Sequence, residues 1–125
     1  MTGTVALASL IAMGAVAVAP VHVTVRAATR TPKINAHWAY TVRATRDAAP
    51  IGGKITVQIV DPIGGVHPVE FGANTKKVTN VPIKGTFRDY MIFPASARGI
   101  PLKIRVTVVV GTSRSVVNYP VTPRA

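Results

Sequence analysis

The chain of 125 residues has room for one domain, and its lack of cysteine excludes a disulfide framework and a thiolate metal site. Fifteen Lys and Arg residues face four acidic ones, which gives a net charge of +11 at pH 7. This excess disfavours cationic partners and is compatible with nucleic acid, acidic cell-wall polymers and anionic lipid headgroups. The basic residues are scattered, which excludes a polybasic tail and leaves solubility as the competing explanation of the charge.

An uncharged apolar segment opens the chain, since residues 1–25 contain no Asp, Glu, Lys or Arg. Residues 5–19 are typical of the hydrophobic region of an export signal, and two overlapping Ala-Val-Ala triplets at its end carry the small residues of a cleavage site. A membrane anchor and a core helix are the alternatives. An anchor fits less well because Arg26 and Arg30 follow the run, which would keep the folded domain in the cytoplasm.

We therefore expect residues 1–28 to be a signal peptide, or an N-terminal anchor, with a short linker. Residues 29–125 are expected to form the domain, and the mature chain is expected to begin between Val18 and Ala28. The protein is accordingly predicted to be secreted or held in the cell envelope.

The remainder of the chain alternates between apolar and polar residues with a period of two, the pattern of half-buried strands. In the first such segment Trp38 and Tyr40 share one parity, and His37 and Arg43 share the other. Pro68 confines its segment to a sheet edge. The predicted strands cover residues 33–45, 54–60, 66–71, 78–83, 85–93, 102–110 and 114–121. The last two form a hairpin, and the whole pattern predicts an all-β fold, an antiparallel β-sandwich of about seven strands.

From Lys33 to the C-terminus the chain resembles bacterial immunoglobulin-like or fibronectin type III-like extracellular domains. The resemblance depends on Trp38 at an early inward position, on residues 47–53 (Asp-Ala-Ala-Pro-Ile-Gly-Gly) followed by Ile-Thr-Val, and on a closing hairpin with Tyr119 near its end. The cysteine pair of immunoglobulin domains is missing. The resemblance implies an adhesive, spacer or ligand-binding module, and it carries over no site residues.

The sequence contains no recognisable catalytic motif. Asp61 precedes Pro62, as turn-initiating aspartates do, and Asp89 beside Arg88 is expected to face outward as an ion-pair partner. No serine lies in a Gly-x-Ser-x-Gly elbow. We therefore expect a binding or structural module that is not an enzyme and needs no cofactor.

The alternative with the most specific residues is an exported copper-binding protein. His37, on the outward parity of the first strand, and His67, in a loop, would supply imidazole ligands, and Met91 would supply a thioether. No two of these residues lie at a local metal-binding spacing, so the fold would have to bring them together. Histidines on an ordinary surface are the competing explanation.

The polyanion hypothesis places the contact on the outward parity of the strand 102–110, where Lys103 and Arg105 form a candidate basic face. The expected partner is an anionic cell-wall polymer or an envelope protein, and self-association stays open. Nucleic acid is less favoured because Trp38 and Tyr40 fall on the apolar parity rather than among exposed basic residues. Membrane contact is expected only through an uncleaved N-terminal segment.

Overall fold

The computed structural model describes residues 19–69 and 77–125, so most of the expected export segment lies outside the described residues. Within these ranges there are nine strands and one short 3-10 helix, and the strands pair antiparallel. No helix in the described part of the chain is long and apolar enough to cross a membrane. The all-β prediction is confirmed. The elements are β1 (His22–Ala27), β2 (His37–Arg46), β3 (Ala49–Pro50), β4 (Gly52–Val60), β5 (Val66–Pro68), β6 (Val81–Lys84), β7 (Thr86–Ile92), η1 (Ala95–Ala97), β8 (Leu102–Val110) and β9 (Ser113–Val121).

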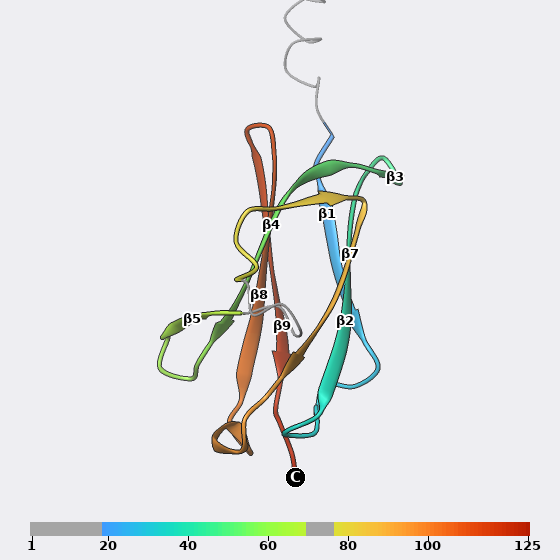
Figure 1. The fold of residues 1–125 in the computed structure, drawn as a ribbon. Coiled ribbons are helices and arrows are strands. Elements are labelled where there is room, and N and C mark those ends of the chain that lie inside the picture. The colour runs from blue at the N-terminus through green and yellow to red at the C-terminus, as the bar shows by residue number, and fades with distance from the viewer. Residues whose placement is uncertain (1–18, 70–76) are drawn as a thin grey trace, which may run out of the picture.

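The strands form two layers that pack face to face as a sandwich (Figure 1). One layer has the order β1-β2-β7, with the short β3 beside the end of β2. The other has the order β6-β4-β8-β9, with β5 beside β4. Lys84 pairs with Thr86 across Gly85, so hydrogen bonding passes from β6 to β7 at this corner and joins the two layers.

Aliphatic and aromatic side chains fill the space between the layers. Trp38 of β2 is 5% exposed, its ring lies 5.7 Å from that of Tyr40, and its indole N–H donates to the carbonyl oxygen of Thr29 at 2.9 Å. The facing layer supplies buried aliphatic residues, among them Ile55, Val57, Ile104, Val106 and Val108. The inward position expected of Trp38 is confirmed, and polar residues of the same strands are left on the two outer faces.

The sheet begins earlier than expected, because β1 pairs with β2 along its whole length. Part of the linker expected over residues 1–28 therefore belongs to the domain. Val23 and Val25 are half-buried, whereas Arg26 is exposed, so the period of two is present in β1. The sequence does not show β1 as a separate strand, because β1 follows the apolar run with Pro20 as the only turn-forming residue between them.

The first expected strand, in contrast, starts later than residue 33. β2 begins at His37 because Asn35 has a φ of 58°, in the left-handed region that interrupts a strand. The backbone N–H of Arg124 donates to the carbonyl oxygen of Pro32 at 2.9 Å, and that of Ile34 donates to the carbonyl oxygen of Arg124 at 2.8 Å. These bonds tie the β1–β2 connection to the segment that follows β9.

The expected hairpin at the C-terminus is confirmed. β8 and β9 pair in register from Leu102 opposite Val121 to Val110 opposite Ser113. β8 also pairs with β4, so it is a central strand of its layer.

Candidate functional site

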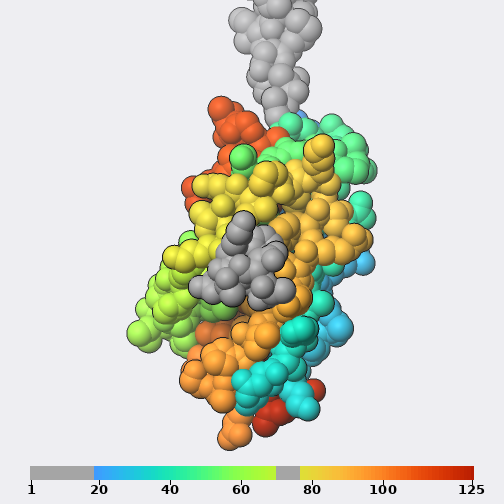
Figure 2. Space-filling view, in the orientation of Figure 1, coloured from blue at the N-terminus to red at the C-terminus, as the bar shows by residue number. Residues whose placement is uncertain are grey.

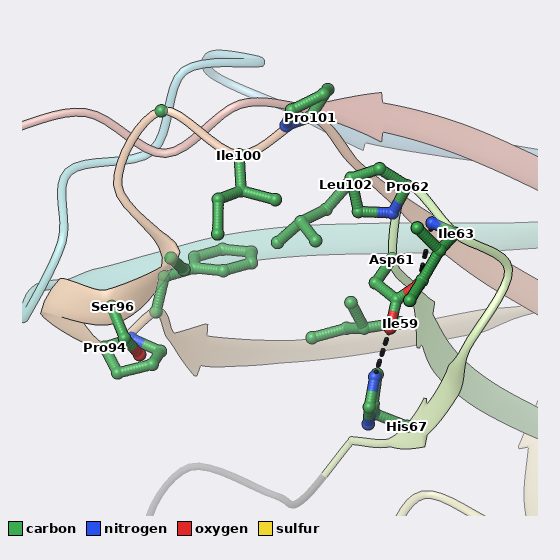
Figure 3. Close-up of a pocket in the computed structure, with 13 residues that line it drawn as sticks. Ile59, Asp61, Pro62, Ile63, His67, Pro94, Ser96, Ile100, Pro101 and Leu102 are labelled. Atoms are coloured by element: carbon green, nitrogen blue, oxygen red, sulfur yellow. Dashed lines mark hydrogen bonds and ion pairs between the residues drawn. The ribbon is translucent and has the colours of Figure 1, made fainter.

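An apolar groove lies where the turn between β4 and β5 meets the loop between β7 and β8 (Figure 3). Its volume is about 770 Å³. Phe93 and Leu102, which are 1% and 8% exposed, form its floor together with Ile59. Its walls are Pro62 and Ile63 on one side and Pro94, Ile100 and Pro101 on the other. We call this feature the end groove, and the two segments that wall it reach the same lower side of the molecule in Figure 2.

Asp61 fixes the turn that carries one wall of the end groove. Its Oδ1 accepts hydrogen bonds from the backbone N–H groups of Ile63 at 3.0 Å and Gly65 at 2.8 Å. The main chain closes the same turn, since Gly64 N–H donates to the carbonyl oxygen of Asp61 at 3.1 Å. Ile63 is consequently held with 93% of its surface exposed. The turn-initiating role expected of Asp61 is confirmed.

The second carboxylate oxygen of Asp61 lies 2.9 Å from Nε2 of His67, whose side chain is 60% exposed. The His67 imidazole, and then the Gly65 backbone N–H, hold the pKa of the Asp61 carboxyl below its ordinary value. Ser96 also lines the groove, on the far wall (Figure 3). The hydrogen bond of the His67 ring within the described ranges is to Asp61 rather than to the Ser96 hydroxyl.

The structure does not bring the three candidate copper ligands together. His37 lies on the outer face of β2, where its ring stacks on that of Tyr90 at 4.0 Å. Met91 is 4% exposed and lies on the inward parity of β7, opposite Trp38. His67 belongs to β5 in the other layer. Among the described residues no group of three His, Cys, Asp or Glu residues is arranged to hold a metal ion.

Asp89 does not face outward as expected. It lies directly opposite Tyr40 in the β2–β7 pairing, and it shares its parity with the buried residues Phe87 and Met91. The expectation failed because the segment 85–93 has aromatic residues on both parities, so its sequence does not show which face is buried. Burial and the nearby Asp89 carboxylate raise the pKa of the Tyr40 phenol.

The outer face of the β1-β2-β7 layer carries three arginines, and we call Arg26, Arg43 and Arg88 the arginine face. Arg26 and Arg88 flank Thr41 in one row across the three strands, and Arg43 lies in the adjacent row. All three side chains are exposed. Arg26 and Arg43 also line a polar depression of about 340 Å³ together with the neighbouring residues Thr24, Thr45 and Ala48.

The basic face expected from the sequence lies on the other layer. Lys103 is exposed and Arg105 is half-buried, and both point outward from β8. Arg105 lies between Gln58 and Asn118, its partners on β4 and β9. The outward positions of these two residues are as predicted, whereas the arginine face was not predicted.

Besides the arginine face, two features of the candidate sites were not predicted from the sequence. The walls of the end groove come from segments about thirty residues apart, and their contact depends on the strand order. The Asp61–His67 contact had a local signal, because the intervening Pro-Ile-Gly-Gly turn returns the chain on itself.

Comparison with known proteins assigns the chain to no family. No family model matches it, and no curated protein matches it. Among solved structures, it is similar to a DUF4466 family protein from Parabacteroides merdae, with 12% sequence identity and a TM-score of 0.45. The match covers 83% of this chain and 44% of that one, so the chain spans less than half the length of this neighbour. The immunoglobulin-like or fibronectin-like resemblance stays a prediction beyond the all-β sandwich itself.

Proposed function

We propose that this chain is an exported, non-catalytic binding module of the cell envelope or extracellular space, which holds an anionic polymer against its arginine face. The observation that carries the proposal is the placement of Arg26, Arg43 and Arg88 on three neighbouring strands of one outer face. At the outward positions of these strands there is no acidic residue. Export rests on the apolar N-terminal segment and its small-residue triplets.

The register of the strands concentrates the charge of this face. Neighbouring strands lie about 4.8 Å apart, so Arg26 and Arg88, separated by β2, have backbones roughly 10 Å apart. Arg43 lies on β2 between them, one row away. None of the three guanidinium groups has an acidic partner within 4.0 Å among the described residues. Each is therefore available for bidentate contact with phosphate or carboxylate groups.

The same face offers groups that suit a polymer rather than a single ion. Thr24 and Thr45 line the polar depression beside Arg26 and Arg43, and their hydroxyls can donate to or accept from a ligand. Further along the face, the rings of Tyr90, one row from Arg88, and His37, two rows from it, stack to provide a flat surface. A chain of linked anionic units would follow the strands from one feature to the other.

The face of Lys103 and Arg105 is the weaker candidate. On that layer Lys54 and Arg114 share one row, Arg105 lies two rows away and Lys103 lies three rows away. The charge is thus spread along the strands, and Arg105 is half-buried. Long-range attraction from this face would still assist encounter with a polyanion.

The test compares two triple variants that have the same net charge. Arg26→Ser/Arg43→Ser/Arg88→Ser removes the arginine face, and Lys54→Ser/Lys103→Ser/Arg105→Ser removes the same number of charges from the other layer. Binding to polyphosphate and to poly-L-glutamate is measured at two salt concentrations. We expect the first variant to lose affinity at least about tenfold, and the second to lose less than about threefold.

Equal losses in the two variants would show that only net charge matters, and a larger loss in the second would move the site to Lys103 and Arg105. Affinity of the unmodified protein should also fall between 0.05 and 1 M salt, because the screening length shrinks to about 3 Å at 1 M. Binding that is unchanged by salt would contradict an electrostatic contact. Absence of binding to either polymer at physiological salt would contradict the proposal and leave solubility as the role of the charge.

A further inference from the structure

The end groove takes no part in the polymer contact proposed above, since its residues belong to a different part of the molecule. We propose that the end groove is a second binding site, which takes the apolar chain of a single-chain amphiphile with an anionic head. The proposal rests on four properties of the groove: its preformed walls, its apolar floor, three wall prolines that have no backbone N–H, and the charge at its rim.

Both walls are held in place by the protein itself. The Asp61 turn is fixed by the contacts described above. The opposite wall contains η1 and the residues that follow it: Arg98 N–H donates to the carbonyl oxygen of Ala95 at 3.1 Å, and Ile100 N–H donates to that of Ala97 at 3.1 Å. Gly99 N–H donates to the carbonyl oxygen of Pro123 at 2.8 Å, which ties this loop to the C-terminal segment. A preformed groove loses little conformational entropy when a ligand enters.

The interior of the groove is apolar and of the size of a small-molecule site. Ile59, Ile100 and Leu102 project into the same space (Figure 3). Ligand pockets commonly measure about 300–1,000 Å³, and the groove falls within that range. Ile63 and Ile100 are 93% and 36% exposed, so a ligand that covered them would remove apolar surface from water.

The chemistry of the walls favours an alkyl chain over a peptide. Pro62, Pro94 and Pro101 have no backbone N–H, so three wall positions offer no donor to a peptide backbone. A bound peptide would bury carbonyl groups without partners there, which costs free energy. An alkyl chain has no such groups to satisfy.

The charge at the rim favours an anionic head. The carboxylate of Asp61 is engaged by His67, Gly65 and Ile63. His67 is 60% exposed, and Arg98, which is also exposed, stands in sequence between the lining residues Ala97 and Gly99. With a net charge of +11, the protein also attracts anions and repels cations at a distance.

The probe is dodecanoate below its critical micelle concentration, titrated into the full-length protein by calorimetry. Ile63→Ser/Ile100→Ser removes exposed apolar surface from the two walls without touching the buried floor. Val116→Ser is the matched control, because Val116 is 46% exposed on β9 and does not line the groove. We expect one site per chain, with affinity lowered about tenfold or more by the double substitution and unchanged by the control.

A second set of measurements tests the head. Arg98→Ser should weaken dodecanoate about threefold to tenfold, whereas Arg114→Ser on β9 should not. Dodecyltrimethylammonium, which has the same chain and the opposite charge, should bind at least about tenfold more weakly. Ser96→Phe, which places a ring on the far wall of the groove, should block dodecanoate, and unchanged melting would show that the fold is intact.

Three results would overturn the proposal. They are failure of dodecanoate to bind the folded protein below micelle formation, equal affinity of dodecanoate for every variant, and binding of the cationic amphiphile as tightly as dodecanoate. Capture by vesicles of phosphatidylglycerol and phosphatidylcholine, without binding of monomeric dodecanoate, would identify the two isoleucines as a membrane-docking surface instead. Because the arginine-face variants leave all groove residues in place, loss of polymer binding and loss of amphiphile binding are distinguishable.

Discussion

The carboxylate of Asp61 lies 2.9 Å from the imidazole of His67, and the same carboxylate accepts the backbone N–H groups of Ile63 and Gly65. One side chain thus holds the whole β4–β5 turn and, with it, one wall of the end groove. Because the acceptor is ionised, the strength of these contacts depends on the protonation of Asp61.

Acid should weaken this turn. The pKa of Asp61 is lowered in the folded protein from an ordinary value of 3.8, so its contribution to stability is present above pH 4 and is lost as the pH falls through the lowered value. We expect the melting temperature of the wild type to exceed that of Asp61→Asn at neutral pH, and the difference to shrink below about pH 4. His67→Gln removes the largest cause of the lowered Asp61 pKa. In a His67→Gln background, the difference in melting temperature between chains with and without Asp61→Asn should therefore change less with pH. A difference that stays constant from pH 2 to pH 7 would contradict the role of the carboxylate.

Trp38 should contribute more to stability than any outward side chain. It is 5% exposed, contacts the rings of Tyr40, Phe93 and Tyr119, and donates to the carbonyl oxygen of Thr29. Trp38→Ala is expected to lower the free energy of unfolding by roughly 3–5 kcal/mol, measured by urea denaturation. Trp38→Phe keeps much of the packing and loses the hydrogen bond, so its cost should be smaller. An unchanged denaturation midpoint for Trp38→Ala would contradict the core position.

The parts of the fold that the sequence predicted well are those with strict alternation and clear turn residues. β8 and β9 follow from the valines and isoleucines of residues 102–110 and from the loop at Gly111, and Trp38 follows from its parity in β2. β1 was missed because its own alternation is masked by the apolar run before it. Asp89 was misplaced because both parities of β7 contain aromatic residues.

The candidate sites were harder to predict because they depend on which strands become neighbours. Arg43 is outward because its parity is opposite to that of the inward Trp38. Nothing in the sequence, however, pairs β2 with β1 on one side and with β7 on the other. The arginine face exists only in that pairing. The end groove likewise requires that β4 and β8 be adjacent, which brings Ile59 opposite Ile104 and sets Leu102 near the β4–β5 turn.

The N-terminus of the mature protein should precede β1. A cut after Ala28 would remove a strand whose Val23 and Val25 pack against the core, so we expect the mature chain to begin between Val18 and His22. Intact mass of the protein secreted by its native host measures this position. A cytoplasmic protein that retains Met1 would contradict export.

The same strand can be tested on purified protein. A chain that begins at Val21 should unfold at nearly the same urea concentration as one that retains residues 19 and 20. The shorter chain loses only the hydrogen bond from Arg46 Nε to the carbonyl oxygen of Ala19. A chain that begins at Thr29 should be less stable by at least about 2 kcal/mol, because it loses the apolar surface buried by two valines. Equal stability of these chains would show that β1 is dispensable.

The hydroxyl of Tyr40 is buried and has no hydrogen-bond partner among the described residues. Tyr40→Phe should therefore raise the free energy of unfolding by about 1 kcal/mol at pH 7, since it removes an unsatisfied polar group and keeps the ring. The raised pKa of the folded phenol means that the wild type loses stability as the pH rises above 10, where only the unfolded chain ionises. The difference in free energy of unfolding between Tyr40→Phe and the wild type should therefore grow above pH 10. Tyr90→Phe, at a half-exposed position, is the control, and a destabilised Tyr40→Phe would reveal a partner for the hydroxyl.

Gly85 forms the corner at which the chain passes from one layer to the other, and it should not tolerate a side chain. Its φ is 74°, its N–H donates to the carbonyl oxygen of Ile51 at 2.7 Å, and a Cβ there would lie 2.6 Å from Cβ of Pro50. Gly111 has a similar φ of 59° but open space around it.

Gly111→Ala should thus lower the free energy of unfolding only by the cost of a left-handed backbone at a residue with a side chain, roughly 1–2 kcal/mol. Gly85→Ala should lower it further, because the close contact with Pro50 is added to the same cost. Urea denaturation of Gly85→Ala, Pro50→Gly and the double variant gives the coupling between the two sites. If the contact is the cause, the double variant will be more stable than the sum of the single losses predicts. Additive losses would mean that the left-handed backbone alone requires glycine, and equal losses at residues 85 and 111 would show that the corner can shift to accept a methyl group.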